Sequence, residues 1–207
     1  MLRILLLLSI LAADAWSQPI RMRDPVQGML LVAKRDLPDP NFAETVVLLL
    51  DYGRKGAVGL ILNRPSQLPV ARIFRDMAAA KSRTDTVFSG GPVEPGSVRA
   101  LQRSKSKLDQ ARPLIEEVYV VSETAHIEKS FREGTPSSEL RFFAGYAGWG
   151  PGQLDREIEF GAWILLDADA ATIFHAKPES LWDRLIRRSE SRMAGWSDQR
   201  NRALSGF

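Results

Sequence analysis

Two glycine-rich segments of this 207-residue chain have residue types that could hold an anion or position a nucleophile. In residues 142–158, Gly148 and Gly150 allow backbone conformations closed to other residues, and Pro151 suits the first position of a helix. A strand, a glycine turn and a helix in that order point backbone N–H groups outward, where proteins hold phosphates and carboxylates. The segment therefore predicts ligand contacts from Trp149, Gly150, Gly152 and Gln153.

The same segment has a structural interpretation, which its incomplete phosphate pattern favours. The dinucleotide pattern G-x-G-x-x-G fails because its last position is Gln153, and no G-K-[ST] sequence occurs in the chain. Glycine more often marks a tight turn than a binding loop. In this interpretation Tyr146 and Trp149 pack over a sheet, and Leu154 and Ile158 form the apolar face of the helix.

The second glycine-rich segment contains Ser89, Gly90 and Gly91, which we predict to contact a ligand. A hydrolase could use the serine together with carboxylates at the ends of strands, such as Asp51, Asp167 and Asp169. However, the nucleophile elbow G-x-S-x-G is absent, and Ser89 is typical of a turn residue. The sequence therefore predicts no catalytic residue.

Composition restricts metal and thiol chemistry. The chain has no cysteine, which excludes disulfides, thiolate nucleophiles and cysteine-ligated metals. Its two histidines, His126 and His175, lack the spacing to a second ligand that zinc sites show. We predict no metal site and no cofactor, and we expect both histidines to be ordinary polar residues.

The first 15 residues are typical of a secretory signal peptide. Arg3 precedes an apolar run over residues 4–13, and Ala13 and Ala15 flank a cleavage site of small residues. The run is shorter than the roughly 20 residues that cross a bilayer, so no permanent membrane span is expected. We predict a periplasmic or secreted protein, or a cytoplasmic one if the leader is not functional. The predicted parts are a leader at 1–15, a polar lead-in at 16–27, one compact domain at 28–188 and a basic tail at 189–207.

The apolar spacing predicts short strands interleaved with a few helices. Strands are predicted at 28–33, 46–50, 57–62, 87–88, 98–101, 118–121, 140–147, 162–166 and 172–174. Helices are predicted at 70–80, 123–131, 152–159 and 179–188. Several consecutive strands are too close for a crossover helix, and 46–50 should form a hairpin with 57–62. The pattern favours an α+β domain with a mostly antiparallel or mixed sheet over a doubly wound fold.

Basic residues gather in two places without a nucleic-acid motif. Residues 99–112 hold five basic side chains against one acidic one, and the predicted helix at 179–188 has an arginine face opposite an apolar face. The net charge of +3 is modest, and no aromatic residues interleave with the basic ones. We expect solvated basic faces and no nucleic-acid partner.

Four stretches, spread over residues 28–188, jointly resemble the bacterial YqgE/AlgH family. They include Asp39-Pro40-x-Phe42, residues 59–65, Gly90-Gly91-Pro92, and the run from Gly145 through Trp149 to Leu154. The resemblance implies a compact α+β domain with a strongly curved, barrel-like sheet, without an established activity or catalytic set. One branch of the family is named for a role in regulating alginate production. Gln102 stands where a histidine is common, which weakens any imidazole mechanism there.

Two classes of function follow from these observations. The favoured hypothesis is a non-enzymatic binding or regulatory protein whose glycine-rich loops meet an unknown small anionic ligand or a protein partner. The alternative is a hydrolase or nucleotide-handling enzyme, which the missing elbow, phosphate loop and metal spacing disfavour. A transcription-linked regulator in the cytoplasm is a third possibility if the leader is not functional.

Overall fold

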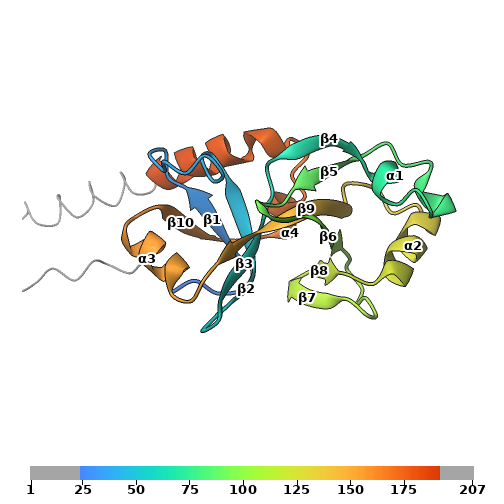
Figure 1. Ribbon diagram of the computed structural model, residues 1–207, viewed down its shortest axis with the longest axis horizontal. Helices are drawn as coiled ribbons and strands as arrows, with labels where there is room; N and C mark the ends of the chain where they lie inside the picture. The colour runs from blue at the N-terminus through green and yellow to red at the C-terminus, as the bar shows by residue number, and fades with distance from the viewer. Residues whose placement is uncertain (1–23, 192–207) are drawn as a thin grey trace, which may run out of the picture.

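The structure, a computed structural model, describes residues 24–191 (Figure 1). Within these residues ten strands form one sheet, in the order β10, β1, β2, β3, β9, β6, β8, β7, with β4 and β5 on a branch beside β9. All but one of the strand pairs are antiparallel, and the sheet curls into a half-barrel. The predicted α+β fold with a curved, mostly antiparallel or mixed sheet is confirmed.

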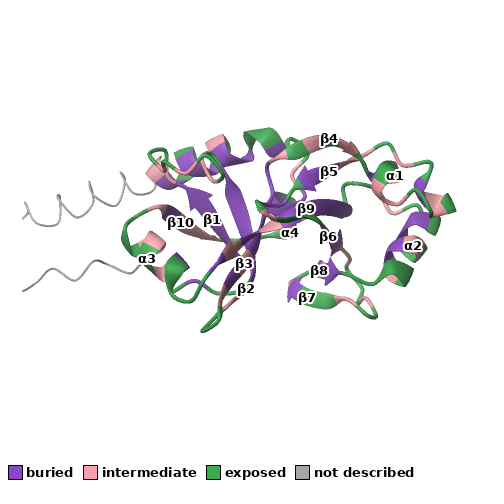
Figure 2. Cartoon of the chain, in the orientation of Figure 1, coloured by how far each residue is buried: buried purple, intermediate pink, exposed green. Residues whose placement is uncertain are grey.

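The first half of the sheet is almost entirely apolar. It contains β1 (Met29–Ala33), β2 (Val46–Gly53), β3 (Gly56–Ile61) and β10 (Trp163–Asp167). All five residues of β1 are buried, which explains why this strand has no alternation of polar and apolar residues (Figure 2). β2 and β3 form the predicted antiparallel hairpin.

Residues 181–191 form a helix that packs on this half of the sheet. Leu181, Trp182, Leu185 and Ile186 are buried, and the arginines at 184, 187 and 188 are exposed, as the sequence predicts. The Trp182 indole N–H donates to the Ala33 carbonyl at 2.7 Å, which anchors the helix to β1. A short 3₁₀ turn, η2 (Pro178–Ser180), leads into the helix.

The second half of the sheet carries the helix α2 and a separate apolar cluster. Its strands are β4 (Pro65–Pro69), β5 (Thr86–Ser89), β6 (Val93–Arg103), β7 (Arg112–Ile115) and β8 (Val118–Val121). The helix α2 (Thr124–Arg132) buries Ile127 and Phe131 against Phe142 and neighbouring side chains. The predicted strand at 118–121 and helix at 123–131 are confirmed within one residue.

The long strand β9 (Leu140–Trp149) belongs to both halves. On one edge, residues 147–149 pair with β3 and residues 143 and 144 pair with β5. Its other edge pairs with β6. The helix α3 (Gln153–Glu159) follows β9 directly and leads into β10.

Two of the predicted elements are wrong. The predicted helix at 70–80 is divided into α1 (Val70–Ile73) and a 3₁₀ turn, η1 (Ala78–Ala80). Phe74 ends α1 because its ring packs between Phe131 and Phe142, 5.4 and 5.0 Å away, and this tertiary contact overrides the helical spacing. The predicted strand at 172–174 lies in a helix, α4 (Ala170–Ile173), because the Asp169 carboxylate accepts the Thr172 N–H at 2.6 Å and caps it.

One strand is longer than the sequence predicts, and two strands were not predicted. β6 extends through residues that we predicted as a loop, with register shifts between Val93 and Val98. β4 and β7 were not predicted, since each contains proline. Proline lacks the N–H that a central strand donates, but it is tolerated at the edge of a sheet, where both strands lie.

The predicted signal peptide lies outside the described residues, as does most of the predicted basic tail. Export to the periplasm therefore stays a prediction. Among residues 24–191 no helix is long and apolar enough to cross a membrane.

Candidate functional site

The structure brings the two glycine-rich segments together at one point, here called the glycine junction: residues 89–91 against residues 144–147 of β9. The Gly90 N–H donates to the Ala144 carbonyl at 2.8 Å, and the Gly90 carbonyl accepts the Ile61 N–H at 2.9 Å. A Cβ on Gly91 would lie 2.2 Å from the Tyr146 carbonyl carbon. The glycines are therefore needed because backbone packs directly on backbone here, between the part of β9 that pairs with β5 and the part that pairs with β3.

The left-handed glycines are not those that we predicted. Gly145, with φ of 69°, and Gly152, with φ of 66°, have positive φ, whereas Gly148 and Gly150 do not. Pro151 is not the first helical residue, because Gly152 is the N-cap and α3 begins at Gln153. A Cβ on Gly145 would lie 2.5 Å from the Gly91 carbonyl oxygen, so this left-handed residue also serves the glycine junction.

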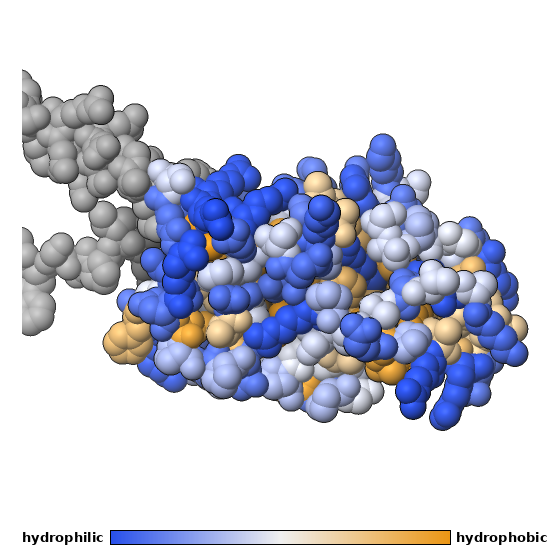
Figure 3. All heavy atoms as spheres, turned by 90° about the horizontal axis from the view of Figure 1, so that it is seen from above, coloured by the Kyte–Doolittle hydropathy of each residue, from blue (hydrophilic) through white to orange (hydrophobic). Residues whose placement is uncertain are grey.

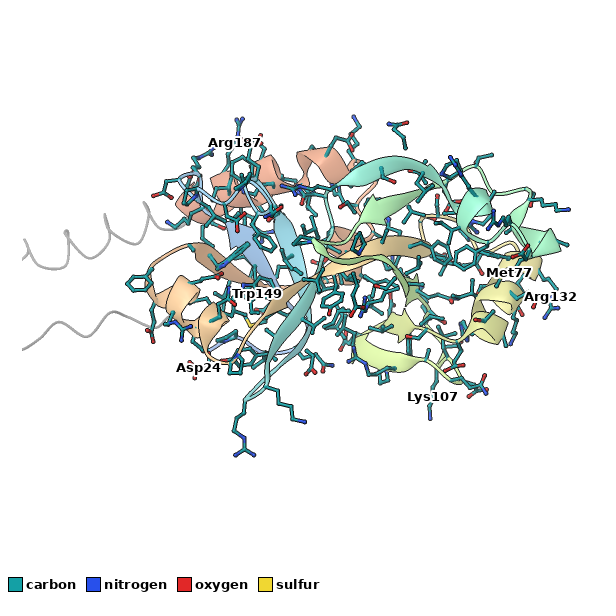
Figure 4. All side chains as sticks on the ribbon, in the orientation of Figure 1. Asp24, Met77, Lys107, Arg132, Trp149 and Arg187 are labelled. Carbon is teal, nitrogen blue, oxygen red and sulfur yellow. The ribbon has the colours of Figure 1, made fainter. Side chains whose placement is uncertain are left out.

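Trp149 is part of a buried aromatic group that fixes α3 on the sheet (Figure 4). Its ring stacks on Phe42 and meets the edge of Trp163, with centroid distances of 5.7 and 6.0 Å. The two indole N–H groups both donate to Glu157 Oε2, each at 2.9 Å. Since Glu157 is on α3, one carboxylate joins β9, β10 and the helix.

The helix start that we predicted to hold an anion is closed by its own side chains. The Gly150 N–H donates to Gln153 Oε1 at 3.1 Å, and Gln153 Nε2 donates to Glu157 Oε1 at 2.9 Å. Asp155 and Glu157 follow within α3, and their negative charges repel an anionic ligand at the start of the helix. The exposed residues Gly150, Gly152 and Gln153 remain predicted partner contacts, and Trp149 is only 5% exposed.

The other motifs in the resemblance also have contacts that build the fold. Asn63 Oδ1 accepts the Val46 N–H and Asn63 Nδ2 donates to the Glu44 carbonyl, both at 2.8 Å. Arg64 donates to the carbonyls of Asn41 and Ala43. These bonds hold the 39–45 loop, and this loop delivers Phe42 to the tryptophans.

Ser89 and the histidines do not form a catalytic group in the described part of the chain. Ser89 is exposed, and its N–H donates to the Arg64 carbonyl. His126 Nε2 lies 2.9 Å from the buried Gln102 Oε1, which also accepts the Ser130 hydroxyl. The Lys177 N–H donates to His175 Nδ1. Residues 24–191 contain no group of three His, Asp or Glu side chains that could hold a metal.

Arg141 is a buried cation that the sequence analysis missed. It is 7% exposed and lies over the rings of Phe88 and Phe174, and its guanidinium donates to the carbonyls of Ile173 and His175 at 3.0 and 2.6 Å. Burial lowers the pKa of Arg141 to about 10, so it remains charged at neutral pH. Its bonds fix the end of α4 against β9.

The start of α4 forms one wall of a cavity of about 420 Å³, which we call the α4 pocket. The β7–β8 turn with Ile115, Glu116 and Glu117 also lines the cavity, as does Arg103 at the end of β6. Ala168, Ala170 and Ala171 leave space beside the capping residue Asp169. A hairpin turn and a helix that are far apart in the sequence thus enclose one site.

Three carboxylates and one guanidinium line the α4 pocket. Arg103 Nη2 and Nε both donate to Glu117 Oε2, at 2.9 and 3.0 Å, which neutralises that pair. Glu116 and Asp169 are exposed, and Asp169 uses Oδ1 for its helix cap. The α4 pocket therefore has a net negative charge beside the small apolar surface that its alanines form.

Two features of the sequence point weakly to the α4 pocket. Asp169 was named as a strand-end carboxylate, but the helix that it caps was predicted as a strand. Glu116 and Glu117 are consecutive acids between two apolar runs, a pattern that indicates a turn. Their approach to α4 depends on the curl of the sheet, which local spacing does not reveal.

Comparison with known proteins supports the architecture. Residues 30–194 match the model of the AlgH-like family. A UPF0301 protein of Streptomyces coelicolor is 36% identical over 170 residues, covering 81% of this chain and 88% of that relative. A UPF0301 protein of Chlorobaculum tepidum is 33% identical over 161 residues, covering 77% and 84%.

Two solved structures have the same fold. The crystal structure of protein DIP2367 from Corynebacterium diphtheriae superposes with a TM-score of 0.68 at 26% identity, covering 80% of this chain and 88% of that one. The solution structure of the AlgH protein from Pseudomonas aeruginosa gives a TM-score of 0.65 at 28% identity, covering 80% and 90%. From the family match and the sequence identity to these relatives, the chain belongs to the AlgH-like, UPF0301 family.

Proposed function

We propose that this protein is a non-enzymatic binding protein that receives a positively charged side chain of a protein partner in the α4 pocket. The observation that supports this proposal is the composition of the pocket. It has an apolar alanine surface bordered by carboxylates, and within residues 24–191 only Glu117 of these is paired with a cation. A lysine or arginine side chain has an apolar stem and a charged end, and it matches both features.

The charge balance favours a cation over the small anionic ligand that the sequence analysis considered. Glu116 and Asp169 both line the pocket, so both carboxylates would attract a cation bound there. Both carboxylates are exposed to water and salt, which screen the attraction. We therefore expect weak, salt-dependent binding to this pocket alone, with further affinity from the surrounding surface.

A non-enzymatic role is supported by the contacts of the groups that could do chemistry. In the described part of the chain, both histidines bond to residues other than Ser89, and no metal group is present. A hydrolase needs its nucleophile and base within hydrogen-bond reach, or close to it. The hydrolase alternative would require turnover that depends on Ser89, and Ser89→Ala tests this directly.

The exposed surface of the described residues also fits a polar partner. Val26 and Phe160 are the large apolar side chains that are clearly exposed, and hydrophilic residues dominate the face in Figure 3. Such a surface offers no broad apolar patch for a permanent, hydrophobic interface. Binding through charge in a small pocket suits a transient or regulatory contact.

The proposal can be tested with short blocked peptides and NMR. Acetyl-alanyl-lysyl-alanine amide should shift the backbone amide signals of Glu116, Glu117 and Ala170, whereas the glutamate analogue should not. In the double variant Glu116→Gln/Asp169→Asn the shifts should be lost. Asparagine can still cap α4, so the variant removes charge without removing the cap.

The matched control is Asp76→Asn/Glu128→Gln, which removes the same two charges outside the pocket. The control should bind the lysine peptide like the wild type. Equal shifts from the lysine and glutamate peptides, or full binding by the pocket variant, would contradict the proposal.

A further inference from the structure

A second, smaller cavity of about 230 Å³ lies between the loop before β5 and the loop after α2. We call it the Arg83 pocket. Four hydroxyl groups line it, on Ser82, Thr84, Thr135 and Ser137. None of the four hydroxyls has a hydrogen-bond partner among residues 24–191. They are therefore free to exchange water for a ligand.

The wall of the Arg83 pocket is fixed by one arginine. Arg83 Nε and Nη2 donate to the two oxygens of Asp85, each at 2.7 Å, and Nη1 donates to the Thr135 carbonyl at 2.8 Å. The guanidinium also lies over the Phe131 ring at 5.0 Å. The side chains of Arg83 and Asp85 are only 10% and 17% exposed. The two loops that carry the hydroxyls are thus tied together before any ligand arrives.

The chemistry of this pocket differs from that of the α4 pocket. Arg83 and Asp85 neutralise each other, so the wall has no net charge to select an ion. Hydroxyl groups both donate and accept, and they pair well with other hydroxyls. The cavity has the volume of roughly eight water molecules at about 30 Å³ each, which is suitable for a single sugar-sized ring.

We infer that the Arg83 pocket binds a small, neutral, polyhydroxylated molecule about the size of one sugar ring. Gly134 also lines the pocket, and no atom lies within 4 Å of the position that a Cβ would take on it. This inference is independent of the proposed protein partner, since the Arg83 pocket and the α4 pocket share no lining residue.

The test uses myo-inositol as the probe and cyclohexanol as its counterpart with a single hydroxyl. Titration of the full chain, followed by backbone amide NMR signals, should shift Thr84, Gly134 and Ser137 with inositol and much less with cyclohexanol. The variant Thr84→Val/Ser137→Ala should raise the inositol Kd roughly 3- to 30-fold, as expected for the loss of one or two hydrogen bonds. Both residues are exposed, so the variant should fold like the wild type.

The matched control is Ser122→Ala/Thr124→Val, which removes two exposed hydroxyls at the opposite end of α2. Arg132, near the pocket end of this helix, points away from the body of the protein in Figure 4. The control should bind inositol with unchanged Kd. Absence of inositol shifts at the pocket, equal shifts from cyclohexanol, or an unchanged Kd in Thr84→Val/Ser137→Ala would overturn the inference.

Discussion

The glycine junction and the α4 pocket differ in how closely their chain segments approach each other and in the kind of side chain that lies between them. At the junction, backbones meet at distances that leave no space for a Cβ, and buried aromatic rings surround the contact. At the pocket, a hairpin turn and a helix stay apart, and charged side chains face solvent between them. A segment rich in glycine can therefore be specific in sequence because of packing, while the site proposed for a partner has an inconspicuous sequence.

The most distinctive motifs of the chain belong to the first kind. Asn63 and Arg64 hold the loop that carries Phe42, and Trp149 completes the aromatic group around Glu157. Each of these residues has a contact that the fold needs. Their specificity is explained by architecture, and it does not by itself indicate a ligand.

The largest effect should come from the aromatic group. Trp149→Ala removes a buried indole, its stacking on Phe42 and its hydrogen bond to Glu157, and should lower the free energy of unfolding by about 3–5 kcal/mol. Guanidinium unfolding followed by circular dichroism measures the loss. Trp149→Phe keeps most of the packing and should cost less. A loss below 1 kcal/mol in Trp149→Ala, on the order of a surface change, would show that this group is not part of the stable core.

A smaller but still clear loss of stability should follow the addition of a single methyl group at the glycine junction. In Gly91→Ala the new Cβ meets the backbone of Tyr146 and Ala147, which cannot move without disturbing β9, and the expected cost is about 3 kcal/mol. Gly96→Ala, in β6, is the control, since no atom lies within 4 Å of its Cβ position. Similar stabilities of the two variants would remove the packing explanation for the junction.

The smallest effect on stability is expected at the α4 pocket. The variant Glu116→Gln/Asp169→Asn should change the free energy of unfolding by no more than about 0.5 kcal/mol, since both side chains are exposed and asparagine retains the cap. Thermal unfolding in parallel with the peptide titration measures both properties of one sample. A large loss of stability together with lost binding would show that these carboxylates serve the fold. The α4 pocket would then no longer differ in role from the glycine junction.

The sequence predicted elements well where local apolar spacing and burial agree. β8 at residues 118–121 has the predicted bounds, and α2 differs by one residue at each end. Prediction failed where a distant contact decided the local structure. Phe74 ends α1 because of rings on α2 and β9, and the short helix α4 depends on one carboxylate cap and on Arg141 bonding to the carbonyls at its end.

For the candidate sites, the sequence predicted which residues can carry charge or hydroxyl groups, but not which of them meet. It determined by itself the absence of cysteine chemistry, the apolar strands and the glycines that packing requires. The tertiary structure alone decided that Gly91 touches Tyr146, that Glu117 and Asp169 line one cavity, and that Arg83 joins two hydroxyl-bearing loops. The physical reason is that strand order and sheet curvature, which depend on the whole core, set these long-range distances, whereas residue type and spacing act only over a few positions.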